Sequence, residues 1–381
     1  MSVTNQPLVS VVVPVYGTAS FLPACLDSLL GQTLADIEII TVNDASPDES
    51  QAIIERYASQ DARVKLLINH ENQNAYETRR RGFAAASGLY IATCDSDDSL
   101  PLTALEALYK TAQKTGADLV HGQMREFVAG KNLISAPHSS SFLASDGRSY
   151  ILSFLRFCRG WSACGKLYHR RVVEKALKSL PVGLHLHVLD DLLYAYFLGL
   201  ATQKYAPLSE VVYHYRVAHG NFFSIPERCL TNIADAFAVF AILKDHIAQN
   251  SANAGYDFWL RLLIRQHIVK VFAYLPGSVD AALAREIISE KLGAEYLASL
   301  YADRPSPFSA DKSPTTHSYA FQPRSFFSLV NRFFSRRDRG IPLKSGIYEF
   351  FICVRYLISL FGNRGCRHAI EKVVKLLKSS S

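Results

Sequence analysis

Residues Leu89–Asp98 read LYIATCDSDD, a largely apolar run followed at once by clustered aspartates. The apolar run has the length and composition of a buried strand. Ligands of an open α/β sheet bind outside the carboxyl ends of its strands, where Asp95, Asp97 and Asp98 would lie. Carboxylates this close repel one another unless a cation or a hydrogen-bonding ligand compensates them. The stretch therefore favours a site for a hard divalent metal, and a solvated acidic turn is the alternative.

The composition of the chain is that of a folded protein with more than one part. The chain has 381 residues, of which 49% are hydrophobic, and this supports a sizeable core. Its N-terminus has no pattern of a secretory leader, and the apolar run at residues 8–13 is too short to span a bilayer, so we expect a cytosolic chain. The seven cysteines are scattered and form no CxxC pair, which argues against a disulfide framework or a structural zinc site.

Short β-branched runs alternate with amphipathic segments in the first part of the chain. The expected strands are at residues 9–13, 37–42, 64–68 and 89–94, and the expected helices at 21–30, 51–58, 76–86 and 102–114. Strands that are apolar throughout suit a parallel sheet covered on both faces. We therefore expect an α/β fold, a doubly wound and mostly parallel sheet, with a helical extension after it.

Polar residues follow the predicted strands. Pro14 and Tyr16 close the first strand, and Asp44 follows the second. The carboxyl ends of parallel strands share one edge of the sheet, so these residues should emerge on the same edge as the acidic cluster. Asp44 can accept a hydrogen bond from a nucleotide base or a ribose hydroxyl. Ser46 is predicted to cap a helix that has Pro47 at its first position.

Several motifs carry a resemblance to a known family. They are VSVVVPVY at 9–16, LDSLLGQT at 26–33, VNDASPD at 42–48, Arg79 with Gly82, ASGLYI at 86–91, and DSDD at 95–98. Weaker motifs are GKLY at 165–168, LDDLL at 189–193, and YHYR at 213–216 followed by His219. In this order the motifs resemble those of the family 2 glycosyltransferases of the GT-A fold, as found in bacterial polysaccharide synthesis.

The resemblance implies an inverting, metal-dependent transfer of a sugar from a nucleotide sugar, UDP-linked, to a saccharide or lipid-linked acceptor in cell-surface polysaccharide synthesis. It implies Mg²⁺ or Mn²⁺ on Asp97 and Asp95, and catalysis by Asp191 with Asp190. The residues implied to bind the nucleotide sugar are Pro14, Tyr16, Asp44, Arg79, Asp95, Ser96 and His219. The chemistry is consistent, because a metal ion stabilises the leaving diphosphate and direct displacement needs one base for the acceptor proton.

Charge and composition divide the chain into four predicted parts: a GT-A domain at 1–225, a helical extension at 226–302, a Pro- and Ser-rich linker at 303–323, and a basic amphipathic tail at 324–381. The tail holds twelve Lys and Arg against three Asp and Glu beside several aromatic residues. It is predicted to lie on an anionic membrane surface, which would make the enzyme cytoplasmic and peripheral on the inner face of the cell membrane. Packing of the tail on protein is the alternative. Nucleic acid is not an expected partner, because the rest of the chain is mildly acidic and has no nucleic-acid module.

Two other functions fit parts of this pattern. A nucleotidyltransferase acting on a sugar phosphate uses a similar sheet and metal, but it should have a Gly-rich, basic loop after the first strand. Residues 16–20, YGTAS, are neither strongly Gly-rich nor basic. A non-catalytic sugar- or lipid-binding scaffold of the same fold would be indicated by loss of Asp97 or Asp191, and both residues are present.

Overall fold

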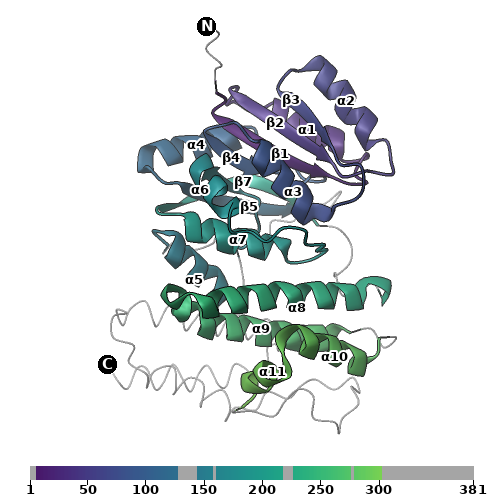
Figure 1. The fold of residues 1–381 in the computed structure, drawn as a ribbon. Coiled ribbons are helices and arrows are strands. Elements are labelled where there is room, and N and C mark those ends of the chain that lie inside the picture. Colours follow the sequence, from purple (N-terminus) through teal and green to yellow (C-terminus); the bar gives the residue numbers. More distant parts are fainter. Residues whose placement is uncertain (1–5, 128–143, 158–159, 218–225, 276–278, 303–381) are drawn as a thin grey trace, which may run out of the picture. The chain divides into compact units, whose positions relative to one another are not determined.

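The part of the chain up to residue 216 forms a seven-stranded sheet, in the order β3-β2-β1-β4-β6-β5-β7 (Figure 1). The computed structural model describes residues 6–127, 144–157, 160–217, 226–275 and 279–302. The strands are β1 Val9–Val15, β2 Ile37–Asn43, β3 Val64–Ile68, β4 Tyr90–Thr93, β5 Leu119–Phe127, β6 Lys166–His169 and β7 Tyr205–Arg216. In this sheet β6 runs antiparallel to both neighbours, and the other pairs are parallel. The prediction of a mostly parallel α/β sheet is confirmed.

Helices follow the strands in the predicted alternation. Those up to residue 201 are α1 Leu22–Leu30, α2 Ser50–Gln60, α3 Asn74–Ala85, α4 Ala104–Thr115, α5 Gly147–Phe157, α6 Arg170–Leu177 and α7 Asp190–Ala201. The eight elements predicted between residues 9 and 114 all exist, and their ends differ from prediction by at most two residues. Continuous apolar strands therefore located the first four βα units correctly.

The predicted cap of α2 is wrong. The helix begins at Ser50, and the Ser50 amide donates a hydrogen bond to the Asp48 carboxylate at 3.1 Å. Ser46 Oγ instead accepts a hydrogen bond from the Gly17 amide at 3.3 Å. The residues after β2 thus form a loop tied to the end of β1, because a contact with the neighbouring strand outweighs the local capping pattern.

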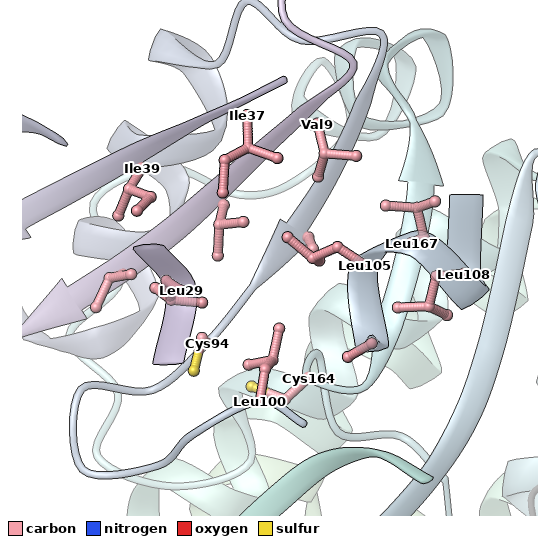
Figure 2. Close-up of a cluster of buried hydrophobic side chains, with 14 of the residues drawn as sticks. Val9, Leu29, Ile37, Ile39, Cys94, Leu100, Leu105, Leu108, Cys164 and Leu167 are labelled. Atoms are coloured by element: carbon pink, nitrogen blue, oxygen red, sulfur yellow. The ribbon is translucent and has the colours of Figure 1, made fainter. Parts of the chain in front are cut away.

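Both faces of the sheet are buried under helices. Val9, Val11 and Val13 of β1 are fully buried and belong to one hydrophobic cluster, which Figure 2 shows between the sheet, α1 and α4. On the opposite face, a Cβ on Gly82 of α3 would lie 2.3 Å from Val12 Cγ1. A glycine at this position therefore lets α3 approach β1 closely, and burial on both faces explains why β1 is apolar throughout.

In the described part of the chain, the helices after the sheet are α8 Pro226–Gln249, α9 Ala254–Tyr274, α10 Ala281–Leu292 and α11 Ala294–Leu300, with a short 3₁₀ turn before α9. Here α8 contacts α7, and α9 contacts α5. The Asn253 side chain, for example, donates a hydrogen bond to the Tyr196 hydroxyl of α7 at 3.3 Å. Within the described ranges, no helix is long and apolar enough to cross a membrane. The division at residue 225 stays a prediction, and the predicted linker and tail lie outside the described residues.

Glu38 of β2 is a buried carboxylate with several donors. It accepts hydrogen bonds from Lys65 Nζ at 2.5 Å, from the Ser10 hydroxyl at 2.5 Å and from the Ser87 amide at 2.7 Å. Burial alone would raise the pKa of Glu38, but these donors outweigh burial and lower the pKa to about 2. Glu38 therefore stabilises the fold above the unfolded-state pKa of 4.5, and this stabilisation is lost as the pH falls towards 2.

A Glu38→Gln variant is expected to lose roughly 1–3 kcal/mol of unfolding free energy at pH 7, because the buried donors lose a charged acceptor. The difference from wild type should narrow as the pH falls from 4.5 to about 2, measured by urea unfolding. Glu55→Gln is the control, because Glu55 is an exposed residue of α2. A difference from wild type that stays constant down to pH 2.5 would contradict this assignment.

Candidate active site

Arg79 of α3 joins two distant segments of the chain. It is only 3% exposed. Its Nη2 lies 2.9 Å from Asp95 Oδ1, and its Nη1 lies 2.5 Å from Asp190 Oδ2 and 3.6 Å from Asp191 Oδ1. The guanidinium also lies 5.7 Å from the centre of the Tyr194 ring. One buried cation thus holds the loop after β4 against the first turn of α7.

Negative charge exceeds positive charge in this cluster, because three carboxylates face one guanidinium. Burial raises the pKa of Asp191 to about 7, with the charge of Asp190 adding to the rise and Arg79 opposing it. Burial opposes the charge of Arg79, but the nearby carboxylates raise the pKa of Arg79 well above its ordinary value. Arg79 is therefore a permanent cation, whereas Asp191 can exchange a proton near neutral pH.

The two oxygens of Asp191 have different surroundings. Oδ1 accepts a hydrogen bond from the Ala163 amide at 3.2 Å and faces Arg79. Among the residues that the structure describes, Oδ2 has no hydrogen-bond partner, and the side chain keeps 29% of its exposure. Leu189, two residues earlier, has a left-handed backbone with φ 59°, which is costly for a branched side chain. The chain is thus bent so that Oδ1 of Asp191 is held by a hydrogen bond and Oδ2 is accessible to a ligand.

The acidic loop after β4 is fixed by β7. The Tyr213 hydroxyl donates a hydrogen bond to Asp98 Oδ2 at 2.7 Å and accepts one from the Asp95 amide at 3.0 Å. The Arg216 amide donates to Asp98 Oδ1 at 2.6 Å, and Arg216 Nε donates to the Asp97 carbonyl at 2.9 Å. Burial and, next, the charge of Asp95 raise the pKa of Asp98 to about 8. Asp98 therefore positions the loop, a role that the sequence motif did not assign to it.

Asp97 suits a ligand of a divalent cation. Burial and the charge of Asp95 raise the pKa of Asp97, which indicates negative charge without sufficient compensation. The charge of Arg216 opposes this rise but does not outweigh burial and the charge of Asp95. Carboxylate oxygens of this kind suit Mg²⁺ or Mn²⁺, so the donor chemistry fits the implied metal. Groups of three or more His, Cys, Asp or Glu placed to hold a metal do not occur within the described ranges.

The other predicted residues lie at the same strand ends but outside the Arg79 cluster. Asp44 is 2% exposed, and its Oδ1 accepts hydrogen bonds from Asn69 Nδ2 at 2.7 Å and from the Gln73 amide at 2.8 Å. Ser96 Oγ accepts a hydrogen bond from the Thr18 hydroxyl at 2.8 Å. Asp44 is therefore already engaged by its neighbours in a separate network.

Two further predicted residues lie at the carboxyl end of β1. Pro14 belongs to β1, and Tyr16 directly after it is 53% exposed. Tyr16 thus presents an accessible ring at the edge where the acidic loop emerges. His219 lies outside the described residues, so its predicted role stays a prediction.

Residues 10–177 match the model of a family described as "Glycosyl transferase family 2". The putative glycosyltransferase EpsH of Bacillus subtilis is 32% identical over 214 residues, which cover 56% of this chain and 62% of EpsH. The chondroitin synthase of Pasteurella multocida is 27% identical over 303 residues, which cover 78% of this chain and 29% of that protein. The chain thus spans less than two thirds of the length of either relative.

Solved structures resemble the chain in fold. The 1–349 fragment of S. aureus TarS has a TM-score of 0.57 at 17% identity, covering 76% of this chain and 82% of the fragment. The same fragment in complex with UDP has a TM-score of 0.54. At this identity the likeness concerns the fold alone, and it agrees with the GT-A architecture predicted from the motifs. Over residues 10–177, therefore, the chain is similar to glycosyl transferase family 2.

Proposed function

We propose that the chain is an inverting, metal-dependent glycosyltransferase, which moves a sugar from a UDP-sugar to a saccharide or lipid-linked acceptor in cell-surface polysaccharide synthesis. The observation that carries this proposal is the buried Arg79, which brings Asp191 of α7 to the acidic loop that follows β4. This contact puts a candidate base beside a candidate donor site. The family match over residues 10–177 supports the reaction class, and the UDP complex of TarS supports the donor class.

Asp191 acts as the general base in this proposal. A base is most effective when its pKa lies near the working pH, and the pKa of Asp191 is raised to about 7. Its Oδ2 takes the proton of the acceptor hydroxyl while Oδ1 stays anchored on the Ala163 amide. The acceptor oxygen then bonds to the anomeric carbon as the bond from that carbon to the diphosphate breaks. Attack from the opposite side inverts the anomeric configuration and requires no nucleophile from the protein.

Asp97 and Asp95 serve the donor side. They would hold Mg²⁺ or Mn²⁺, and the bound ion supplies positive charge where the leaving diphosphate becomes more negative. Tyr213 keeps the acidic loop in place through Asp98, so Asp97 is presented at a fixed position. Nucleotide-sugar binding by Pro14, Tyr16, Asp44, Arg79, Ser96 and His219 belongs to this proposal as well.

The reaction can be tested with the full chain, Mn²⁺ and a panel of UDP-sugars. We expect release of UDP from one donor, accelerated by an added saccharide acceptor. Early ¹H NMR spectra of the product should show inverted anomeric configuration. A product with retained configuration would overturn the direct displacement and, with it, the role of a single base.

An Asp97→Ala variant is expected to bind UDP at least about tenfold more weakly than wild type when Mn²⁺ is present, because the metal loses a charged ligand. Without Mn²⁺ the two affinities should agree, and both can be measured by calorimetry. Asp36→Ala is the control, because Asp36 is an exposed residue just before β2. Equal affinities in Mn²⁺ would remove Asp97 from the metal site.

The proposal includes the place of action. The basic tail at 324–381 would bring the enzyme to anionic lipid on the inner face of the membrane, where a lipid-linked acceptor is available. The proposal includes no nucleic-acid partner.

The nucleotidyltransferase alternative loses support, because residues 10–177 match a glycosyltransferase family.

A further inference from the structure

One peptide unit lies between Lys166 and Asp191. Lys166 Nζ donates a hydrogen bond to the Ser162 carbonyl, and the N–H of the same peptide unit, that of Ala163, donates to Asp191 Oδ1 at 3.2 Å. The carbonyl and the N–H of a trans peptide point in opposite directions. The ammonium group and the carboxylate therefore bind opposite ends of a single peptide dipole.

Lys166 is an unusual residue for its position. It begins β6, is 1% exposed, and its Nζ lies 6.0 Å from the centre of the Tyr150 ring. In the described chain, no carboxylate lies within ion-pair distance of this ammonium group. Burial lowers the pKa of Lys166 to about 8, although the charge of Asp191 opposes the change, so Lys166 is still mostly charged at pH 7. A buried charge without an ionic partner is costly, which suggests a role beyond packing.

We propose that Lys166 is a positioning residue, which acts on Asp191 through the Ser162–Ala163 peptide. The inference rests on the proposed function, in which Asp191 is the base. The ammonium group polarises the peptide and so strengthens the N–H donor to Oδ1. This anchors Oδ1, leaves Oδ2 for the acceptor, and favours the ionised form of Asp191 that accepts a proton.

Other charged and titratable groups also affect the protonation of Asp191, and a test of Lys166 must leave these groups unchanged. The charged or titratable groups near Asp191 or Lys166 are Asp190, Arg79, Asp95, Cys164, Tyr168, Tyr150, Tyr215 and His121. Burial holds the pKa of His121 well below its ordinary value, so His121 is neutral. Among the described residues, removing Lys166 thus removes one of the two cations near Asp191, while the contacts of Arg79 remain.

The test is a direct titration of Asp191. In protein labelled with ¹³C at the aspartate carboxyl carbon, the NMR signal missing from Asp191→Asn belongs to Asp191. In Lys166→Met, which keeps the length of the side chain without its charge, we expect the titration midpoint of Asp191 to rise by about one unit. Lys166→Gln, which can still donate a hydrogen bond but has no charge, should raise it as well.

Lys244 provides a matched control. Its Nζ donates a hydrogen bond to the Leu292 carbonyl at 3.1 Å and lies 4.9 Å from the centre of the Tyr296 ring. Lys244→Met therefore removes a carbonyl hydrogen bond and a ring contact from α8, outside the Asp191 cluster, together with an ion pair to Asp245 at 3.5 Å. We expect this variant to leave the midpoint of Asp191 unchanged.

Measurements of UDP release distinguish a failure of this inference from a failure of the proposed function. The acid limb of UDP release from a UDP-sugar should move to higher pH by the same amount in Lys166→Met, with unchanged UDP affinity. An unchanged Asp191 midpoint in both Lys166 variants overturns the inference. If the midpoint moves while UDP release does not depend on Asp191, the link between the two residues stands and the base role fails.

If neither Lys166 variant folds, the wild-type protein can be used to test the link between Lys166 and Asp191. Its Ala163 amide proton should change chemical shift when Asp191 titrates and again when Lys166 loses its proton. An amide that follows Asp191 alone overturns the inference.

Discussion

An Asp191→Asn variant is expected to transfer sugar at least about a hundredfold more slowly than wild type, because an amide cannot take the acceptor proton. UDP affinity should stay close to that of wild type. The asparagine fills the same volume, and its oxygen can still accept the hydrogen bond from the Ala163 amide. UDP release at saturating donor measures the rate, and calorimetry measures the affinity.

Asp190→Asn is the informative comparison for this variant. The charge of Asp190 contributes to the raised pKa of Asp191, so its removal should lower that pKa. The acid limb of the rate would then move to lower pH rather than disappear. Turnover at the wild-type rate in Asp191→Asn would eliminate Asp191 as the base.

An Arg79→Met variant is expected to lose about 3–5 kcal/mol of unfolding free energy at pH 7, because Asp95, Asp190 and Asp191 lose their shared buried cation. The loop after β4 would no longer be held against α7, so UDP binding should weaken as well. Urea unfolding at pH 7 measures the first effect, and calorimetry with UDP measures the second.

Arg63→Met is the matched control for Arg79→Met. Arg63 forms an ion pair with Asp61 at 2.9 Å, and both side chains are 30% exposed. Water screens such a pair, so we expect a loss of no more than about 1 kcal/mol. A loss that small in Arg79→Met would show that the three carboxylates do not depend on the guanidinium.

The first half of the sheet could be read from the sequence, because its strands are buried on both faces and read as unbroken apolar runs. The second half could not. β6 has four residues, too few for a periodic signal, and its antiparallel pairing with β4 depends on a partner far away in the chain. The parallel pairing of β5 with β7 is likewise a long-range contact that local sequence does not encode.

Sequence motifs named the candidate site residues, but they did not give the contacts between them. Motifs identified Arg79 and Asp190, yet the ion pair between them joins positions 111 residues apart. The hydrogen bond from Tyr213 to Asp98 spans 115 residues. The local sequence contains no clear signal for Lys166, which begins the four-residue strand KLYH.

Calorimetric titration of the full chain with UDP and a panel of UDP-sugars, each with and without Mn²⁺, tests most directly whether the acidic loop and Arg79 form a donor site. We expect UDP and one UDP-sugar to bind with one-to-one stoichiometry in the presence of Mn²⁺ and at least about tenfold more weakly in its absence. If no nucleotide binds under either condition, this edge of the sheet is not a nucleotide-sugar site and the proposed transfer is wrong.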